Sequence, residues 1–444
     1  MRKTSPLIAA MAILVALPAV AQDAAATGAA PAVSADVAYI FNTLLFLIGG
    51  FLVMWMAAGF AMLEAGLVRS RNVTTQLFKN VSLFAIAGLM YWLIGYNLMY
   101  PGDDGWTVPG VIGQIFSPKA IDPVAAGDAS AGYSAGSDFF FQLMFCATTA
   151  SIVSGTLAER VKLWPFMIFT VLLTGVIYPI EASWEWGTGF LDQMGFSDFA
   201  GSTLVHATGG FAALAGAIIL GPRSGKYRAD GRMQPMPGSN LALATLGTFI
   251  LWLGWFGFNG ASQLAIGSVN DAADVSRIFV NTNMAASAGA IAAIGVTQAL
   301  YGKIDLTMVL NGALAGLVAI TAEPLFPSIF GSILIGAVGG AIAVLVVPML
   351  DRFRIDDVVG AIPVHLVAGI WGTLVVPASN PDASYITQLV GVAAIGAFTF
   401  VLSFVIWTVL KATMGIRVDE EAEISGLDIS EMGMEAYPDF VQAK

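Results

Sequence analysis

The sequence predicts an all-α polytopic membrane protein with 11 transmembrane helices, an outside N-terminus, a cytoplasmic C-terminus and an inverted repeat relating helices 1–5 to helices 6–10. Three observations support this fold class. The chain is 57% hydrophobic and only 11% charged, whereas soluble domains carry about 25% charged residues. Long apolar runs recur, with positive charge gathered between alternate runs, and one histidine-containing pattern occurs twice. We therefore expect a helical bundle built to cross a bilayer.

The N-terminus has the pattern of a secretory signal peptide. Arg2 and Lys3 precede a short apolar run, and the small-residue triplet at 19–21 offers a cleavage site. The run is shorter than the ~20 residues of a membrane span, so we expect residues 1–21 to be a cleaved signal peptide. The alternative is an uncleaved first helix. After cleavage, residues 22–36 would form an extracytoplasmic segment.

Eleven apolar runs approach the ~20 helical residues that a bilayer core requires. They lie near 37–63, 78–100, 137–158, 162–181, 199–221, 239–260, 277–300, 305–322, 328–350, 358–377 and 385–411. The transmembrane domain thus covers residues 37–412, and residues 413–444 form an acidic tail whose composition alone is that of a solvated segment.

Positive residues favour one side of these spans. With an outside N-terminus, the outer side holds only Lys119 and Arg277. The cytoplasmic loops and helix ends hold Arg69, Arg71, Lys79, Arg160, Lys162, Arg223, Lys226, Arg228, Arg232, Lys303, Arg352, Arg354, Lys411 and Arg417. This asymmetry matches the positive-inside rule and sets the predicted orientation.

Motifs of soluble enzymes are missing from the sequence. It contains no P-loop, GxSxG or HExxH pattern. The single cysteine, Cys146, lies in an apolar run, which excludes a disulfide framework and a thiolate metal site. Glycine pairs at Gly312/Gly316 and Gly336/Gly340 have the spacing of close helix packing. We expect no enzyme activity and no cofactor.

The only two histidines share one template. Residues 198–210 read DFAGSTLVHATGG and residues 357–369 read DVVGAIPVHLVAG. Each stretch has an aspartate, a glycine three residues later, a histidine eight later and a glycine twelve later. Helix 5 would run inward and helix 10 outward, so the copies are inverted, which is typical of transporter repeats.

The template predicts that His206 and His365 are neighbours at the centre of the membrane. Eight helical residues advance about 12 Å, close to the midplane of a ~30 Å core. Ionisable groups there are expensive and usually mark a pathway; the alternative is a pair of packing residues. Asp357 fits a helix cap, whereas Asp198 suits either a cap or the attraction of cations.

These segments resemble the ammonium transporter (Amt) branch of the Amt/Rh/Mep family. Further matching stretches are FQLMF at 141–145, WGTGF at 186–190 and WFGFNGAS at 255–262. The likeness covers nearly the whole mature chain. Two departures, Ser202 and Leu366 where glycine is common in the family, do not fall on residues with a family role.

The resemblance implies a role for each matching site residue. Phe145 and Phe258 would be stacked rings that gate the pore, and Trp186, Ser262 and Phe145 would form the outer substrate-binding site. Asp198 would order that site from behind. His206 and His365 would line the pore and relay protons. Apart from the resemblance, the cap position of Asp357 predicts that this residue is structural.

The family also implies what the whole protein does. It would be a homotrimer in the bacterial inner membrane that takes up ammonium, and its analogue methylammonium, as a nitrogen source. Ammonium would be captured, deprotonated and conducted as ammonia through a narrow apolar pore, with or without a separately relayed proton. The tail would pack under neighbouring subunits and help to dock a P-II-type regulatory protein.

Three other functions remain open from the residues alone. Two histidines on separate helices are able to ligate a haem, although nothing else in the sequence suggests one. A sodium-coupled symporter also has inverted repeats, but no predicted helix has a central break flanked by polar residues. A sensor role is the hardest to separate from transport, and no separate signalling domain is visible.

Overall fold

The computed structural model describes residues 33–101, 131–228, 230 and 232–438. The predicted signal peptide lies outside these residues, as do residues 22–32 and the loop 102–130. Where the chain is described it is all helical, and β-structure is limited to isolated bridges at Val161–Arg417 and Tyr227–Met233. The predicted secondary-structure class is therefore confirmed.

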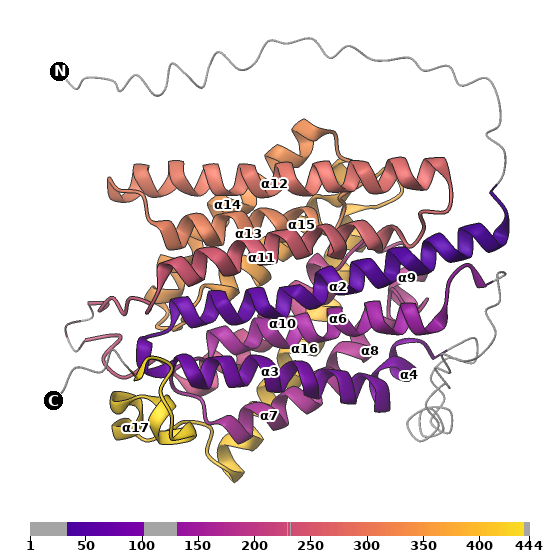
Figure 1. Ribbon diagram of the computed structural model, residues 1–444. Coiled ribbons are helices and arrows are strands. Elements are labelled where there is room, and N and C mark those ends of the chain that lie inside the picture. The colour runs from indigo at the N-terminus through magenta and orange to yellow at the C-terminus, as the bar shows by residue number, and fades with distance from the viewer. Residues whose placement is uncertain (1–32, 102–130, 229, 231, 439–444) are drawn as a thin grey trace, which may run out of the picture. The chain divides into compact units, whose positions relative to one another are not determined.

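The long helices run roughly alongside one another (Figure 1). The α-helices of the described chain, long and short, are α2 (Ala35–Leu67), α3 (Val73–Met90), α4 (Tyr96–Met99), α6 (Ala135–Thr156), α7 (Leu163–Leu172), α8 (Tyr178–Ser183), α9 (Phe190–Gln193), α10 (Thr208–Leu220), α11 (Leu241–Gly260), α12 (Val269–Tyr301), α13 (Leu306–Ile320), α14 (Ile329–Arg352), α15 (Ala368–Val375), α16 (Tyr385–Thr413) and α17 (Glu420–Ser425). Short 3-10 or π segments join several of them: η1 (Ser70–Asn72), η2 (Tyr91–Gly95), η4 (Leu173–Ile177), η5 (Ser202–Ala207), η6 (Ala261–Gln263), η7 (Ile362–Val367), η8 (Val376–Ala378) and η9 (Asp428–Met432).

Nine helical segments of the described chain are long and apolar enough to cross a membrane. Two more, Leu306–Ile320 and Ile362–Ala378, are apolar but shorter, and they lie where spans 8 and 10 were expected. Each predicted span thus coincides with an apolar helical segment. A membrane protein with many spans follows, and the count of eleven crossings stays a prediction.

Local sequence explains where most of these helices begin. A short polar side chain precedes the first turn and accepts a backbone N–H bond that the helix cannot satisfy itself. Ser268 and Asp271 form a full capping box at α12, with reciprocal bonds of 3.1 Å. The other capping residues in the described chain are Ser34, Ser134, Asn240, Asp305, Ser328, Ser384 and Asp419.

Glycines set the close approach of α12, α13 and α14. A Cβ added at Gly336 would lie 2.1 Å from the carbonyl oxygen of Ala285, and one at Gly340 would lie 2.1 Å from that of Gly289. Both distances are shorter than any van der Waals contact, so these backbones touch directly. The packing role predicted from the glycine spacing is present, with α12 as the shared partner of α13 and α14.

The tail is folded onto the helix ends rather than solvated. The Asp428 carboxylate accepts the backbone N–H groups of Thr74 and Thr75 at 2.9 and 2.8 Å, and Asn72 accepts that of Leu427. Helix α3 has no capping side chain of its own, so Asp428 supplies one from the far end of the chain. Composition alone gave the wrong interpretation of this segment.

Candidate functional site

The two histidines lie side by side in the bundle, as their template predicts. Their Nδ1 atoms are 3.2 Å apart, and their rings are stacked with centroids 5.2 Å apart. Both side chains are buried, with at most 4% exposed. A neutral imidazole has one donor and one acceptor nitrogen, so this contact needs one Nδ1 to carry a hydrogen and the other to accept it.

Each histidine segment begins with an aspartate cap. The two oxygens of Asp198 accept the N–H groups of residues 201–204 at 2.7–3.1 Å. Asp357 likewise accepts from Gly360 and Ile362. Gly201 and Gly360 have φ values of 101° and 82°, a conformation that suits glycine because it has no Cβ. The template therefore encodes the same cap and turn twice.

The last glycine of each copy brings the two segments together. A Cβ on Gly210 would lie 2.6 Å from the Cβ of Leu366, and one on Gly369 would lie 2.4 Å from the carbonyl oxygen of Ser202. Each glycine thus packs against the histidine segment of the other copy. This mutual contact is the physical reason for the repeated spacing, because a larger residue at either position would push the imidazoles apart.

A column of aromatic rings leads to the histidines from one end. Trp186 meets Phe145 edge-on at 5.8 Å, and Phe145 lies 4.1 Å from Phe258 between ring centroids. Phe258 then stacks on His206 at 5.2 Å. Phe145 and Phe258 are at most 1% exposed. The rings expected from the family resemblance therefore form one continuous series.

Sequence reasoning missed two rings that complete this column. Trp255 stacks on His206 at 4.9 Å with an interplanar angle of 18°, and Phe60 lies 6.1 Å from His365. The segment WFGFNGAS contains Trp255 and offered a signal for it. Nothing in the apolar sequence around Phe60 distinguishes that residue from packing.

A pocket of about 570 Å³ opens at the Trp186 end of the column, and we call it the Trp186 pocket. Phe145, Trp186 and Ser262 line it together with three carboxylates, Asp138, Glu185 and Asp192. Ser262 donates its hydroxyl hydrogen to the Phe258 carbonyl at 2.7 Å, which leaves its oxygen free to accept from a ligand. The pocket suits a small cation with N–H donors.

Asp198 is placed behind this pocket rather than in it. It is not among the lining residues, and its backbone is fixed by the indole of Trp186, which donates to its carbonyl at 3.2 Å. The backbone N–H of Asp198 donates to Glu185 at 2.7 Å. Burial, followed by the charge of Asp198, raises the pKa of Glu185 well above its usual value. Of the two roles left open for Asp198, the contacts favour the cap.

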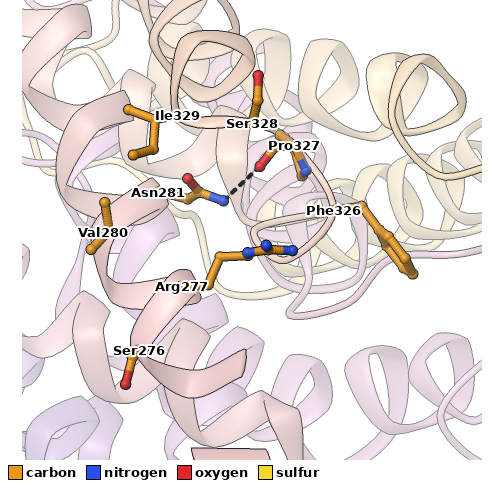
Figure 2. Close-up of a pocket in the computed structure, with 8 residues that line it drawn as sticks. All are labelled: Ser276, Arg277, Val280, Asn281, Phe326, Pro327, Ser328 and Ile329. Atoms are coloured by element: carbon orange, nitrogen blue, oxygen red, sulfur yellow. Dashed lines mark hydrogen bonds between the residues drawn. The ribbon is translucent and has the colours of Figure 1, made fainter. Parts of the chain in front are cut away.

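A separate pocket of about 530 Å³ surrounds Arg277 (Figure 2). It lies between α12 and the start of α14, where Asn281 donates to the Pro327 carbonyl at 2.9 Å. It shares no lining residue with the Trp186 pocket. None of the aromatic rings of the column lines the Arg277 pocket.

The imidazole contact also bears on the haem alternative. Axial ligation by two histidines puts the macrocycle between the rings, and a 3.2 Å contact between nitrogens leaves no room for it. Groups of three or more candidate metal ligands are absent from the described residues. The contact therefore does not fit axial ligation of a haem by these two histidines.

Apolar helices around a ring column that ends at paired imidazoles define a multi-pass membrane transport protein. Comparison with known proteins makes this specific. Residues 44–437 match the model of the Ammonium Transporter Family, and the chain belongs to that family. It is an ammonium transporter and not an enzyme.

The alignments with similar proteins cover most of this chain and most of each relative. Ammonium transporter Amt2 of Archaeoglobus fulgidus is 42% identical over 426 residues, covering 89% of this chain and 88% of the relative. The ammonium transporter of Bacillus subtilis is 35% identical over 409 residues, covering 87% and 96%. Among solved structures, a protein named Sensor Amt Protein matches with a TM-score of 0.82 at 33% identity, covering 90% of this chain and 100% of that chain. Candida albicans Mep2 matches with a TM-score of 0.78 at 26% identity, covering 92% and 94%.

Proposed function

We propose that this protein captures ammonium in the Trp186 pocket, removes a proton, and conducts ammonia past His206 and His365 for nitrogen uptake. The observation that carries the proposal is the direct Nδ1 contact of the two imidazoles at the end of a closed ring column. Methylammonium, which keeps N–H donors and a positive charge, is the expected analogue.

Capture follows from the chemistry of the pocket. A tryptophan face attracts a cation through its quadrupole, worth about 0.5–2 kcal/mol. Ser262 accepts one N–H bond from the ligand, and the carboxylate of Asp192 adds a negative field. Asp198 holds the pocket in shape through its contacts with Trp186 and Glu185.

Deprotonation follows from the column below the pocket. Phe145 and Phe258 close it with buried rings, and a bare cation between apolar rings lacks the hydrogen bonds it had in water. Ammonia is neutral and passes such a gate more readily. Potassium has no proton to release, so the same gate rejects it.

The imidazole pair supplies a route for the released proton. One nitrogen donates and the other accepts, so a proton is able to pass along the pair while ammonia moves beside it. Neither histidine needs to stay charged. Whether this proton crosses decides whether transport carries net charge.

The remaining features of the proposal concern the whole assembly. Eleven spans and an outside N-terminus follow from the charge asymmetry and the apolar runs. Cleavage after residue 21 follows from the basic start, the short apolar run and the small-residue triplet at 19–21. Insertion in the bacterial inner membrane follows from the family resemblance. A homotrimer with the tail near a P-II-type regulator follows from the family resemblance. The folded tail, held by Asp428 on α3, supports a defined inner surface.

A current measurement tests the proposed function. Purified protein in vesicles on a solid-supported membrane receives a pulse of ammonium, and the control pulse contains potassium at the same concentration. We expect a protein-dependent ammonium signal in current or internal pH, and none for potassium. Equal responses to both cations, or no transport of ammonium in either readout, would contradict the proposal. The second result would favour a sensor.

A further inference from the structure

Two charged residues lie buried among the helices on the far side of the histidines from Trp186. Glu64 on α2 and Lys79 on α3 are each 1% exposed. The proposed function uses neither residue. Buried ionisable groups in a membrane protein are costly and usually functional, and Lys79 was expected in a cytoplasmic loop or at a helix end. This pair therefore needs a physical account.

The Glu64 carboxylate is held by neutral donors on one oxygen only. Its Oε2 accepts from the side-chain amide of Gln76, from Asn80 at 2.7 Å and from the Ser154 hydroxyl at 3.0 Å. Its Oε1 has no hydrogen-bond donor among the described residues. Lys79 does not form a direct ion pair with it, because the ammonium donates to the Ser154 carbonyl at 2.8 Å.

Glu64 and His365 line the same small cavity. Its other polar lining residues are Ser151 and Asn311, and the rest of its wall is apolar. The space open to the centre of a water molecule is about 10 Å³, close to the minimum of about 10–15 Å³ that one water needs. Four polar side chains thus line the cavity, and a buried water usually has two to four polar partners.

We propose that Glu64 is the proton acceptor on the far side of the histidine pair, reached from His365 through one water in this cavity. The inference rests on the proposed function, since the proton comes from captured ammonium. His365 gives a proton to the water as the water gives one to Glu64 Oε1, because the three donors on Oε2 leave that oxygen no position for it. The carboxylate becomes a carboxylic acid, and the histidine returns to its neutral form.

A cation lies close to this carboxylate. Ser154 links the two groups, since its carbonyl accepts from the Lys79 ammonium at 2.8 Å and its hydroxyl donates to Glu64 at 3.0 Å. The cycle closes when Glu64 releases the proton to water on the inner side. No electron moves, and the balance is one proton and one ammonia delivered for each ammonium captured.

The test measures ammonium-driven current from full-length protein in vesicles. Glu64→Gln should lower the current about 100-fold, which is the low end of the rate effect expected when a positioned proton acceptor is removed. Trimer assembly and methylammonium capture should persist. Ser151→Val should act similarly with Glu64 intact, because its methyl groups fill the water position. Glu323→Gln is the control: this carboxylate is buried and accepts three hydrogen bonds, but lines neither cavity.

An infrared measurement separates proton transfer from a merely structural role. Ammonium addition should produce a protonated-carboxyl band that is lost in Glu64→Gln and kept in Glu64→Asp, with partial current in the aspartate variant. If Glu64→Gln or Ser151→Val carries unchanged current while the His206→Ala/His365→Ala double variant loses it, the Glu64 relay is wrong and the histidine relay stands. If the double variant also carries unchanged current, the proposed function itself fails.

Discussion

Two nitrogen atoms 3.2 Å apart, one from each copy of the histidine template, lie at the end of the ring column. Their contact depends on few residues. An aspartate cap orients each segment, and a glycine in each copy lets the other copy approach. The stacked rings of Phe258 and Trp255 then fix the plane of His206. The imidazoles are thus placed by backbone geometry before any ligand arrives.

Replacing Trp186 with leucine tests the capture site. The change removes a cation–π contact worth about 0.5–2 kcal/mol, so apparent affinity for methylammonium should weaken about two- to thirtyfold. Trp184→Leu is a matched control, because Trp184 packs against Phe190 and Phe398 and does not line the pocket. Equal affinities in the wild type and Trp186→Leu would argue against capture at this position.

The buried pair of Asp356 and Arg223 predicts a pH dependence of stability. Arg223 donates to both carboxylate oxygens, at 2.8 and 3.0 Å. Burial alone would raise the pKa of Asp356, but the charges of Arg160 and Arg223 and the hydrogen bonds from Arg223 outweigh it and hold that pKa below its usual value. The stabilisation is present above the unfolded-state pKa of about 3.9 and is lost as the pH falls toward the folded-state value.

Thermal unfolding in detergent checks this dependence. The midpoint of wild-type protein should fall as the pH drops below about 4, and Asp356→Asn should lower it at neutral pH by removing an interaction on the order of 3–5 kcal/mol. Asp351→Asn is the control, since this carboxylate is partly exposed and weakly paired. An unchanged neutral-pH midpoint for Asp356→Asn would show that the pair contributes nothing.

Single residues differ in how far their sequence reveals them. Histidine is rare here, so two copies in one template point to a site. Phe60 and Trp255 are apolar residues in apolar helices, and only their position beside an imidazole gives them a role. Glu64 is a charged residue near the end of a span, where sequence cannot separate a solvated carboxylate from a buried one.

At the scale of helices, glycine contacts predict sharply different effects along α12. Gly289→Ala should destabilise the protein by about 1–3 kcal/mol, because the new methyl would lie 2.3 Å from the carbonyl oxygen of Gly312. Gly295→Ala on the same helix has no heavy atom within 4 Å and should be neutral or stabilising by up to about 1 kcal/mol. Thermal midpoints of the two variants give the comparison. A similar midpoint in both would contradict direct backbone contact.

Helix positions could be predicted from apolar runs, but irregular turns could not. Each of the eleven runs coincides with an apolar helical segment. The π turns η5 and η7 (Figure 1 shows the adjoining α10 and α15) arise from the aspartate caps and the crossing of two segments. Such turns depend on contacts between distant parts of the chain. The contacts of the tail could not be predicted for the same reason. Its partner residues lie at positions 72–75, far away in the sequence.

At the scale of the whole molecule, the charge asymmetry predicts its orientation. In a Cys146→Ser background, Ala131→Cys should react with an impermeant thiol reagent in intact cells, and Arg228→Cys should react only after the cells are opened. Both positions are exposed. The loop at 223–232 is rich in positive residues and the loop at 101–135 is not. The reverse labelling pattern would overturn the eleven-span topology.

We propose above all that His206 and His365 carry the proton that ammonium releases. The most direct measurement is current from the His206→Ala/His365→Ala double variant and the wild type, in the same vesicle preparation, under ammonium and then potassium gradients. Without imidazoles the column stays apolar but has no relay, so ammonium-driven current should disappear while assembly persists and potassium stays excluded. If the double variant carries normal ammonium-driven current and still rejects potassium, the histidines are packing residues and the account is wrong.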